Sequence, residues 1–217
     1  VQIIDFSGAF VLPGLIDTHV HLQSHQVLNN IYENRYRRFQ LTRAALTIKA
    51  VGAADLVLSK GFTTVRNLGD GMGIDIALKR AIQNGVMNGP TMHSTGAAVG
   101  PTGTQNDPKL MRQEAIDALR ARTPGAVCDG VTECRVIARK VAAYGHDVLK
   151  IKASGGVEVM SDGVKDPRFT MEELKELVDT AHSLEMKVAA HAISTDSIRD
   201  SIRAGVDSIE HGTGIDD

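Results

Sequence analysis

Ile16-Asp-Thr-His-Val-His-Leu22, with the apolar run Val11–Leu15 that leads into it, predicts a β-strand whose end carries two histidines. Side chains two residues apart on a strand point to the same face, so His19 and His21 can bind one metal ion. A lone His-x-His pair is also compatible with two surface histidines. Asp17 has the same strand parity as His19, and it can either support a metal site or cap a turn.

Beyond this strand, short apolar runs alternate with longer amphipathic stretches. The predicted strands are Phe62–Val65, Thr91–Thr95, Asp147–Ile151, Val188–His191 and Asp207–Glu210, and the predicted helices are Arg35–Lys60, Ile74–Asn84, Arg112–Ala121, Val131–Tyr144, Thr170–Leu184 and Asp196–Ala204. Thr170 and Glu173 have the spacing of a capping box at the start of a helix. About six β-then-α steps predict parallel strands joined by helical crossovers.

Two α/β architectures have this alternation, an open doubly wound sheet and a closed barrel. A dinucleotide-binding sheet carries Gly-x-Gly-x-x-Gly after its first strand. The glycine-rich stretch Gly69-Asp-Gly-Met-Gly73 lacks that spacing and follows the second strand, so we expect a strand-to-helix loop. A TIM (β/α)8-type barrel gathers its site residues where the strands end, as this sequence does.

Two further histidines lie at predicted strand ends. His191 ends the fifth strand and His211 ends the sixth. Each alone is compatible with a core histidine, but four histidines at three equivalent strand ends favour a shared metal site. Glu210 precedes His211, and we expect it to face outward toward the helices.

Lys150 lies between Leu149 and Ile151 in an apolar strand. A buried ammonium group is costly unless it is paired or chemically changed. A lysine that has captured carbon dioxide is a carbamate, an anionic ligand whose two oxygens can bridge two metal ions. The alternative is a lysine at the rim that reaches solvent. We expect Lys150 to point into the barrel and Lys152 to point away.

Composition restricts the classes of partner. Apolar residues make up 42% of the 217 residues, charged residues 23%, and the net charge is −2. Nothing in this balance indicates nucleic acid or an anionic membrane. No apolar run approaches the roughly 20 residues of a transmembrane helix, and no signal peptide is visible, so the cytoplasm is the favoured compartment. Cys128 and Cys134 match neither a disulfide scaffold nor a Cys-x-x-Cys site, and we expect ordinary thiols.

Four of these segments together resemble the amidohydrolase superfamily. They are Val11-Leu-Pro-Gly-Leu-Ile-Asp-Thr-His-Val-His21, Gly61-Phe-Thr-Thr-Val-Arg66, Asp147-Val-Leu-Lys-Ile-Lys-Ala-Ser-Gly-Gly156 and Gly205-Val-Asp-Ser-Ile-Glu-His-Gly-Thr213. They are most similar to the branch with Xaa-Pro dipeptidases, carboxypeptidases that release basic residues and imidazolonepropionase-like hydrolases. The similarity extends over nearly the whole chain.

The resemblance implies a two-zinc site and a division into domains. His19 and His21 would bind one zinc ion, His191 and His211 the other, and carboxylated Lys150 would bridge them. Lys150, His191 and His211 would also be the catalytic residues. Residues 11–217 would form a partial catalytic barrel, with about six of the eight units, and residues 1–10 a remnant of an N-terminal β-sandwich. We also expect a homo-oligomer with a small-molecule or dipeptide substrate.

These expectations give a functional hypothesis with two alternatives. The hypothesis is a metal-dependent hydrolase that uses metal-activated water to cleave the amide bond of a dipeptide or an N-acyl amino acid. A cyclic-amide hydrolase, like imidazolonepropionase or dihydroorotase, is the alternative within the class. The other alternative is a non-catalytic fragment. In the family a metal-binding aspartate on the eighth strand is the expected general base, and Asp217 comes soon after the sixth strand. Where relatives often have His-Ala-His on the fifth strand, this chain has His191-Ala-Ile193.

Overall fold

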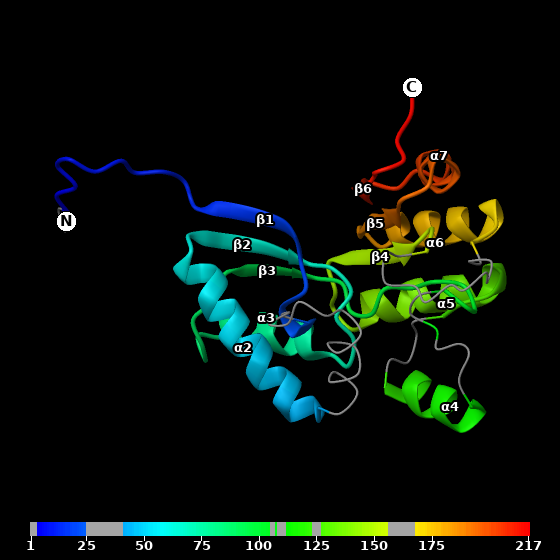
Figure 1. The fold of residues 1–217 in the computed structure, drawn as a ribbon, viewed down its shortest axis with the longest axis horizontal. Coiled ribbons are helices and arrows are strands. Elements are labelled where there is room, and N and C mark those ends of the chain that lie inside the picture. The colour runs from blue at the N-terminus through cyan, green and yellow to red at the C-terminus, as the bar shows by residue number, and fades with distance from the viewer. Residues whose placement is uncertain (1–3, 25–40, 105–106, 108–111, 123–126, 156–167) are drawn as a thin grey trace.

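The fold is an alternation of strands and helices (Figure 1) in a computed structural model that describes residues 4–24, 41–104, 107, 112–122, 127–155 and 168–217. The strands are β1 (Leu15–Val20), β2 (Phe62–Asn67), β3 (Thr91–Ser94), β4 (Val148–Lys152), β5 (Lys187–Ala192) and β6 (Ser208–His211). The helices are the 3₁₀ turn η1 (Leu22–Ser24), α2 (Arg43–Ser59), α3 (Ile74–Gln83), α4 (Gln113–Arg122), α5 (Gly130–Ala143), α6 (Met171–Ser183) and α7 (Thr195–Ala204). The predicted alternation is confirmed, although residues 35–40 of the first predicted helix lie outside the described residues.

The strands form two parallel three-stranded sheets, in the orders β1-β2-β3 and β4-β5-β6. Val99, in the segment after β3, joins them. Its backbone N–H donates to the Lys150 carbonyl at 2.8 Å, and its carbonyl accepts from the Lys152 N–H at 2.7 Å. The six strands therefore follow one another in space in chain order, with β1 and β6 as the outermost two. Whether eight units complete a barrel stays a prediction.

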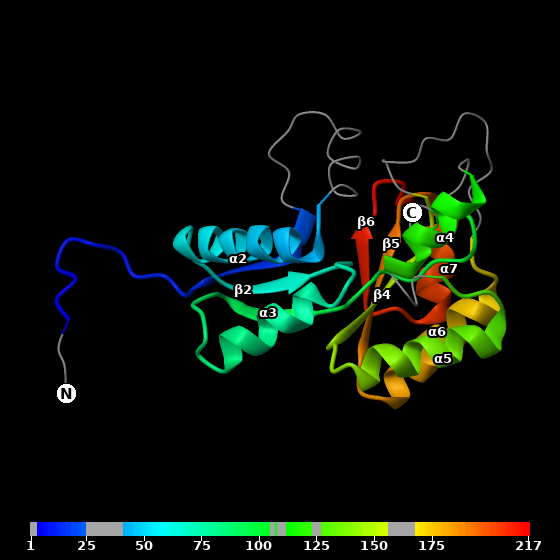
Figure 2. The ribbon, with the colours of Figure 1, turned by 90° about the horizontal axis from the view of Figure 1, so that it is seen from below.

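The helices cover the outer faces of the two sheets (Figures 1 and 2), with α2 and α3 against β1–β3 and α5, α6 and α7 against β4–β6. Leu149 and Ile151 of β4 pack with Leu177 and Val178 of α6 in the larger core. Val148 instead packs with two residues of other strands and loops, Leu68 and Ala189. Because side chains alternate along a strand, Val148 lies on the inner face of β4, opposite the helices.

Two local features follow from the sequence. The capping box at α6 is confirmed: the Thr170 N–H donates to Glu173 Oε2 at 2.7 Å, and the Glu173 N–H donates to Thr170 Oγ1 at 3.3 Å. Gly96, after β3, has a φ of +66°, and a Cβ there would lie 2.8 Å from His146 Nε2. Both the left-handed backbone and the close imidazole therefore require glycine at this position.

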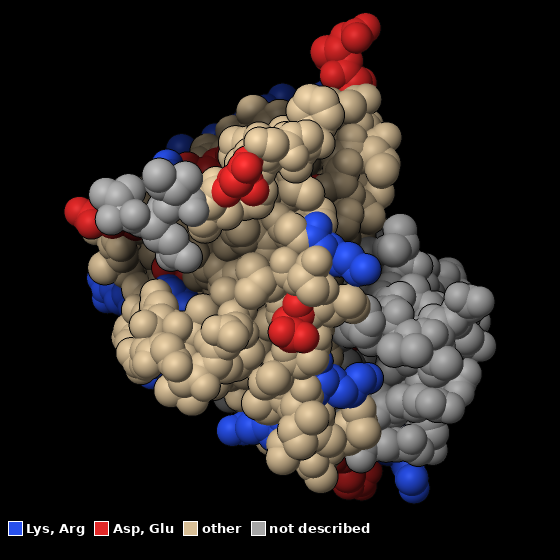
Figure 3. All heavy atoms as spheres, turned by 90° about the vertical axis from the view of Figure 1, so that its left-hand side faces the viewer, with Lys and Arg blue, Asp and Glu red and all other residues tan. Residues whose placement is uncertain are grey.

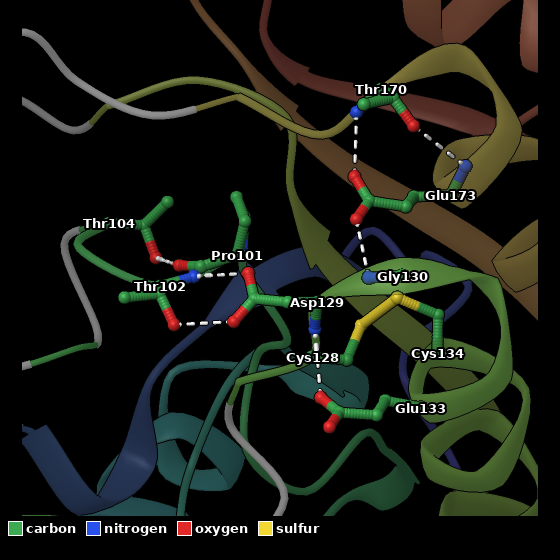
Figure 4. Close-up of a disulfide and its surroundings, with 10 residues drawn as sticks. All are labelled: Pro101, Thr102, Thr104, Cys128, Asp129, Gly130, Glu133, Cys134, Thr170 and Glu173. Atoms are coloured by element: carbon green, nitrogen blue, oxygen red, sulfur yellow. Dashed lines mark hydrogen bonds between the residues drawn. A yellow bond between two sulfur atoms is a disulfide. The ribbon is translucent and has the colours of Figure 1, made fainter.

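The cysteine prediction is wrong, because Cys128 and Cys134 form a disulfide (Figure 4). The Cys128 N–H donates to the Gly100 carbonyl at 3.1 Å, which holds the segment before α5 against the loop that follows β3. This contact places Cys128 beside the first turns of α5, where Cys134 lies, and both side chains are fully buried. The two cysteines are six residues apart, a spacing that matches no recurrent disulfide pattern and so did not indicate the bond.

The amino-terminal residues 4–14 form no strand and extend away from the sheets (Figure 1). Phe10, Val11 and Leu12 are highly exposed there. Acidic and basic side chains are interspersed among uncharged ones on the face seen in Figure 3. None of the described helices is long and apolar enough to span a bilayer. The β-sandwich remnant over residues 1–10 stays a prediction.

Candidate metal centre

Lys150 lies on the inner face of β4 and is 1% exposed. Leu149 and Ile151 on either side pack against the helices, so strand alternation turns Lys150 inward. Its Nζ has no hydrogen-bond partner among the described residues. Burial lowers the pKa of the Lys150 amine to about 7, and the charges of Lys152 and Arg66 add to this effect against the opposing charge of Glu210. A substantial fraction of this amine is therefore neutral, and so nucleophilic, near neutral pH.

The expectation that Lys152 points away from Lys150 is wrong. Residues two apart on a strand share a face, and Lys152 accordingly lies near the same inner groups. Its charge acts on Lys150, His191 and His211. Two lysines therefore lie on the inner face at the end of β4.

His191 lies on the inner face of β5, beside Lys152 in the strand register. It is 4% exposed, and its Nε2 lies 3.0 Å from the Gly155 carbonyl oxygen. A carbonyl oxygen only accepts, so Nε2 carries the proton and Nδ1 keeps its lone pair. Burial, together with the charge of Lys152, lowers the pKa of His191 to about 3. This imidazole is therefore neutral, as a metal ligand must be.

His19 lies on β1, and His21 follows the strand with its ring centroid 5.2 Å from that of His19. The Nδ1 of His19 lies 2.7 Å from Glu210 Oε2 on β6. The backbone N–H of His19 donates to Asp17 Oδ1 at 3.0 Å, so the Asp17 carboxylate binds the backbone of β1. The outermost strands β1 and β6 are thus connected through side chains.

His211 ends β6 with a φ of 74°, a left-handed backbone conformation that is uncommon for residues other than glycine. Its ring centroid lies 4.5 Å from that of His191 and 5.0 Å from that of His19. Burial and the charges of His19, Lys150 and Lys152 lower the pKa of His211. The structure therefore brings together in a chain of ring contacts the four histidines predicted from sequence.

The prediction that Glu210 faces outward is wrong. Glu210 is 5% exposed, and Ser208 Oγ donates to its Oε1 at 2.8 Å from the same face of β6. Ile209 packs against the core on the helix side, so strand alternation places Ser208 and Glu210 together on the inner face. The left-handed backbone at His211 interrupts this alternation, and His211 can therefore also turn toward the other histidines. Burial would raise the pKa of Glu210, but hydrogen bonds from His19 and Ser208 and nearby positive charge lower it to about 2.

Sequence reasoning also missed Arg66 of β2, which reaches across the inner side of the sheets. Arg66 Nη2 donates to Glu210 Oε1 at 2.6 Å, Nη1 donates to Ser208 Oγ at 3.0 Å, and Nε donates to the Thr18 carbonyl at 2.7 Å. These bonds connect β2 with both outermost strands, β1 and β6. The row of strands is therefore curved enough to bring β1 and β6 within reach of one side chain. A charged residue at an inward position of a strand was the signal available in the sequence.

The donor set fits metal ions. Imidazole nitrogens suit zinc, and a buried, partly neutral lysine amine suits conversion to an anionic carbamate. Within the described residues, no three His, Cys, Asp or Glu side chains already converge as ligands of one ion.

The sequence profile described as the amidohydrolase family matches residues 10–217. The chain belongs to the amidohydrolase family. Ochratoxinase from Aspergillus niger is 31% identical to this amidohydrolase over 211 residues, covering 93% of this chain and 43% of the relative. The curated relatives at this similarity are thus about twice as long as the chain.

Solved structures give the same assignment for this amidohydrolase. A Xaa-Pro dipeptidase with methionine bound in its active site superposes with a TM-score of 0.79 at 33% identity, covering 94% of this chain and 49% of that one. A prolidase complexed with N-methylphosphonate-L-proline superposes with a TM-score of 0.77 at 30% identity, covering 99% of this chain and 53% of that one. These neighbours imply the TIM-barrel-like α/β fold of the family.

Proposed function

We propose that this amidohydrolase contributes the metal-binding part of a zinc-dependent hydrolase that cleaves an amide bond in a dipeptide or an N-acyl amino acid. The observation that carries the proposal is the cluster formed by four strand-end histidines and one buried lysine, Lys150, on one inner face. The names of the similar proteins, Xaa-Pro dipeptidase, prolidase and ochratoxinase, support amide hydrolysis.

We assign to the metal ions the ligands that the sequence pattern predicts. His19 and His21 would hold one zinc ion, His191 and His211 would hold the second, and carboxylated Lys150 would bridge the two. The neutral Lys150 amine attacks carbon dioxide, an N–C bond forms, and the nitrogen releases one proton to give the carbamate. The new negative charge also removes the conflict between a lysine ammonium group and two adjacent cations.

Zinc bound at such a site lowers the pKa of water to about 7 and polarises a carbonyl group. The residues of this chain prepare the site for that chemistry. Burial keeps His191 neutral, and its hydrogen bond to the Gly155 carbonyl fixes the direction of its ring. The positive charge of Lys152, near the end of β4, could attract the carboxylate of an amino-acid substrate.

Zinc binding tests the ligand assignment. The purified protein, stripped of metal and reloaded with zinc in bicarbonate, should bind two equivalents per chain. Lys150→Ala should lose at least one equivalent and recover binding when acetate replaces the missing carboxylate oxygens. Lys140→Ala, at an exposed lysine of α5, is the matched control and should bind like the wild type. Equal zinc binding by Lys150→Ala and the wild type would contradict the assignment.

Substrate class is tested with the same zinc-loaded protein. A panel should contain Xaa-Pro and other dipeptides, N-acyl amino acids and cyclic ureides. Hydrolysis of the linear amides, lost in His191→Ala, is the result expected of a protein that also supplies the general-base aspartate of the eighth strand, and little hydrolysis is expected of residues 1–217 alone. Preferential turnover of the cyclic ureides would instead identify a cyclic-amide hydrolase. Absence of turnover across the panel, with zinc bound, would favour the non-catalytic alternative.

A further inference from the structure

The Glu210 side chain contacts both a histidine of the candidate centre, His19, and an arginine, Arg66. It is almost completely buried, and its two carboxylate oxygens have different partners. Oε2 lies 2.7 Å from His19 Nδ1, whereas Oε1 accepts from Arg66 Nη2 at 2.6 Å and from Ser208 Oγ at 2.8 Å. The carboxylate is therefore held from both sides.

The chemistry of these partners determines where the His19 proton lies. An ionised carboxylate only accepts hydrogen bonds, so at 2.7 Å the Nδ1 of His19 must donate. In the neutral imidazole the lone pair is then on Nε2, the nitrogen left for a metal ion. Hydrogen bonding of the opposite ring nitrogen commonly fixes the tautomer and orientation of metal-binding histidines.

We propose that Glu210 and Arg66 form a positioning pair that holds neutral His19 as the Nδ1–H tautomer and so presents Nε2 to the metal. The metal role rests on the proposed function, whereas the tautomer is a property of the metal-free protein. Glu210 acts through His19, and no contact with substrate is required of it.

Arg66 makes the effect of an isosteric substitution predictable. A guanidinium group has only donors, and Arg66 is anchored independently by its bond to the Thr18 carbonyl. In Glu210→Gln the amide must therefore turn its oxygen toward Arg66 and its NH₂ group toward His19. His19 Nδ1 must then accept, which moves the proton to Nε2 and blocks the metal position.

Removal of the arginine should reverse this effect. In the double variant Glu210→Gln/Arg66→Met, Ser208 Oγ loses the hydrogen bond from Arg66, and its hydroxyl can then accept from the amide NH₂ group as readily as it donates to the amide oxygen. The amide can rotate and accept from His19 Nδ1, which restores the original tautomer. A role in which Glu210 merely fills space predicts no such reversal.

Nitrogen-15 NMR of labelled histidines in the metal-free protein at pH 9 reports the tautomer directly. This pH is well above the ordinary histidine pKa of about 6.5, and His19→Asn identifies the signal. We expect Nδ1–H in the wild type, Nε2–H in Glu210→Gln and Nδ1–H again in the double variant. An Nε2–H tautomer or a doubly protonated ring in the wild type would overturn the proposal, as would an unchanged tautomer in Glu210→Gln.

Zinc titration is the second measurement. Glu210→Gln should weaken zinc binding by about 10- to 100-fold, the usual effect of removing a partner of a metal-binding histidine, and the double variant should recover part of it. Glu176→Gln is the matched control, because it breaks a two-bond Arg135–Glu176 pair on the helices without touching a histidine. Failure of the wild type to bind zinc would refute the proposed function, while the tautomer spectra would still decide the role of Glu210.

Discussion

Replacement of Lys150 by methionine should stabilise the metal-free protein at low pH and much less at high pH. Lys150 is 1% exposed, and burial lowers its pKa from 10.5 to about 7. Below pH 7 the folded state must hold a buried ammonium group, whereas the unfolded state holds a hydrated one. A pKa difference of this size between the unfolded and the folded protein corresponds to a destabilisation of about 5 kcal/mol at a pH where the lysine is protonated in both.

The sign of the pH dependence follows from proton binding. Between pH 7 and 10.5 the unfolded state binds more protons at this residue than the folded state, so the stability of the wild type rises with pH. The destabilisation is about 5 kcal/mol at pH 6 and about 2 kcal/mol at pH 9, and it disappears above pH 10.5. The advantage of Lys150→Met should therefore shrink by about 3 kcal/mol from pH 6 to pH 9. The packing of the methionine side chain contributes equally at both pH values, so it cancels in the difference between them.

Urea unfolding at the two pH values, in metal-free buffer depleted of carbon dioxide, measures this difference. Removal of carbon dioxide keeps the amine unmodified. Lys140→Met, at an exposed lysine of α5, is the control and should show no such pH dependence. A stability difference between Lys150→Met and the wild type that stays constant from pH 6 to pH 9 would refute the assignment of a buried, unpaired amine.

Three further predictions concern stability. Gly96→Ala should destabilise the protein by at least about 1 kcal/mol more than Gly85→Ala, because both glycines have a positive φ but only Gly96 faces a close imidazole; equal thermal shifts would contradict this. Hydrogen bonds outweigh the effect of burial and lower the pKa of Asp207 to about 2. The ionised carboxylate should therefore stabilise the fold by about 1–2 kcal/mol above pH 4, and this contribution should be lost as the pH falls toward 2. In urea unfolding, the destabilisation caused by Asp207→Asn should accordingly vanish in acid. Reduction of Cys128–Cys134, which closes a loop of sequence separation 6, should lower the unfolding free energy by about 2 kcal/mol; thiol titration of the native protein should find no free cysteine.

Local interactions made much of the fold predictable from the sequence. The capping box of Thr170 and Glu173 needs only residues three apart, and the strands and helices follow from apolar periodicity and glycine at the helix ends. The clustering of His19, His191 and His211 was also predictable, because the ends of parallel strands meet at one edge. Lys150 was expected to face inward because an apolar strand surrounds it.

Tertiary structure alone decided the features that depend on residues far apart in the chain. An inward His211 implied an outward Glu210 by strand parity, but Ile209 packs toward the helices and Glu210 faces inward, where His19 and Arg66 complete its hydrogen bonds. The left-handed backbone at His211 lets that residue turn inward as well. The segment that carries Cys128 likewise lies against the distant loop at Gly100. The sequence by itself determined which residues reach the strand ends, because periodicity is local. The curvature of the sheet decided which of these strand-end residues contact one another. A buried charged group such as Glu210 needs hydrogen-bond partners, and here strands far apart in the sequence supply them.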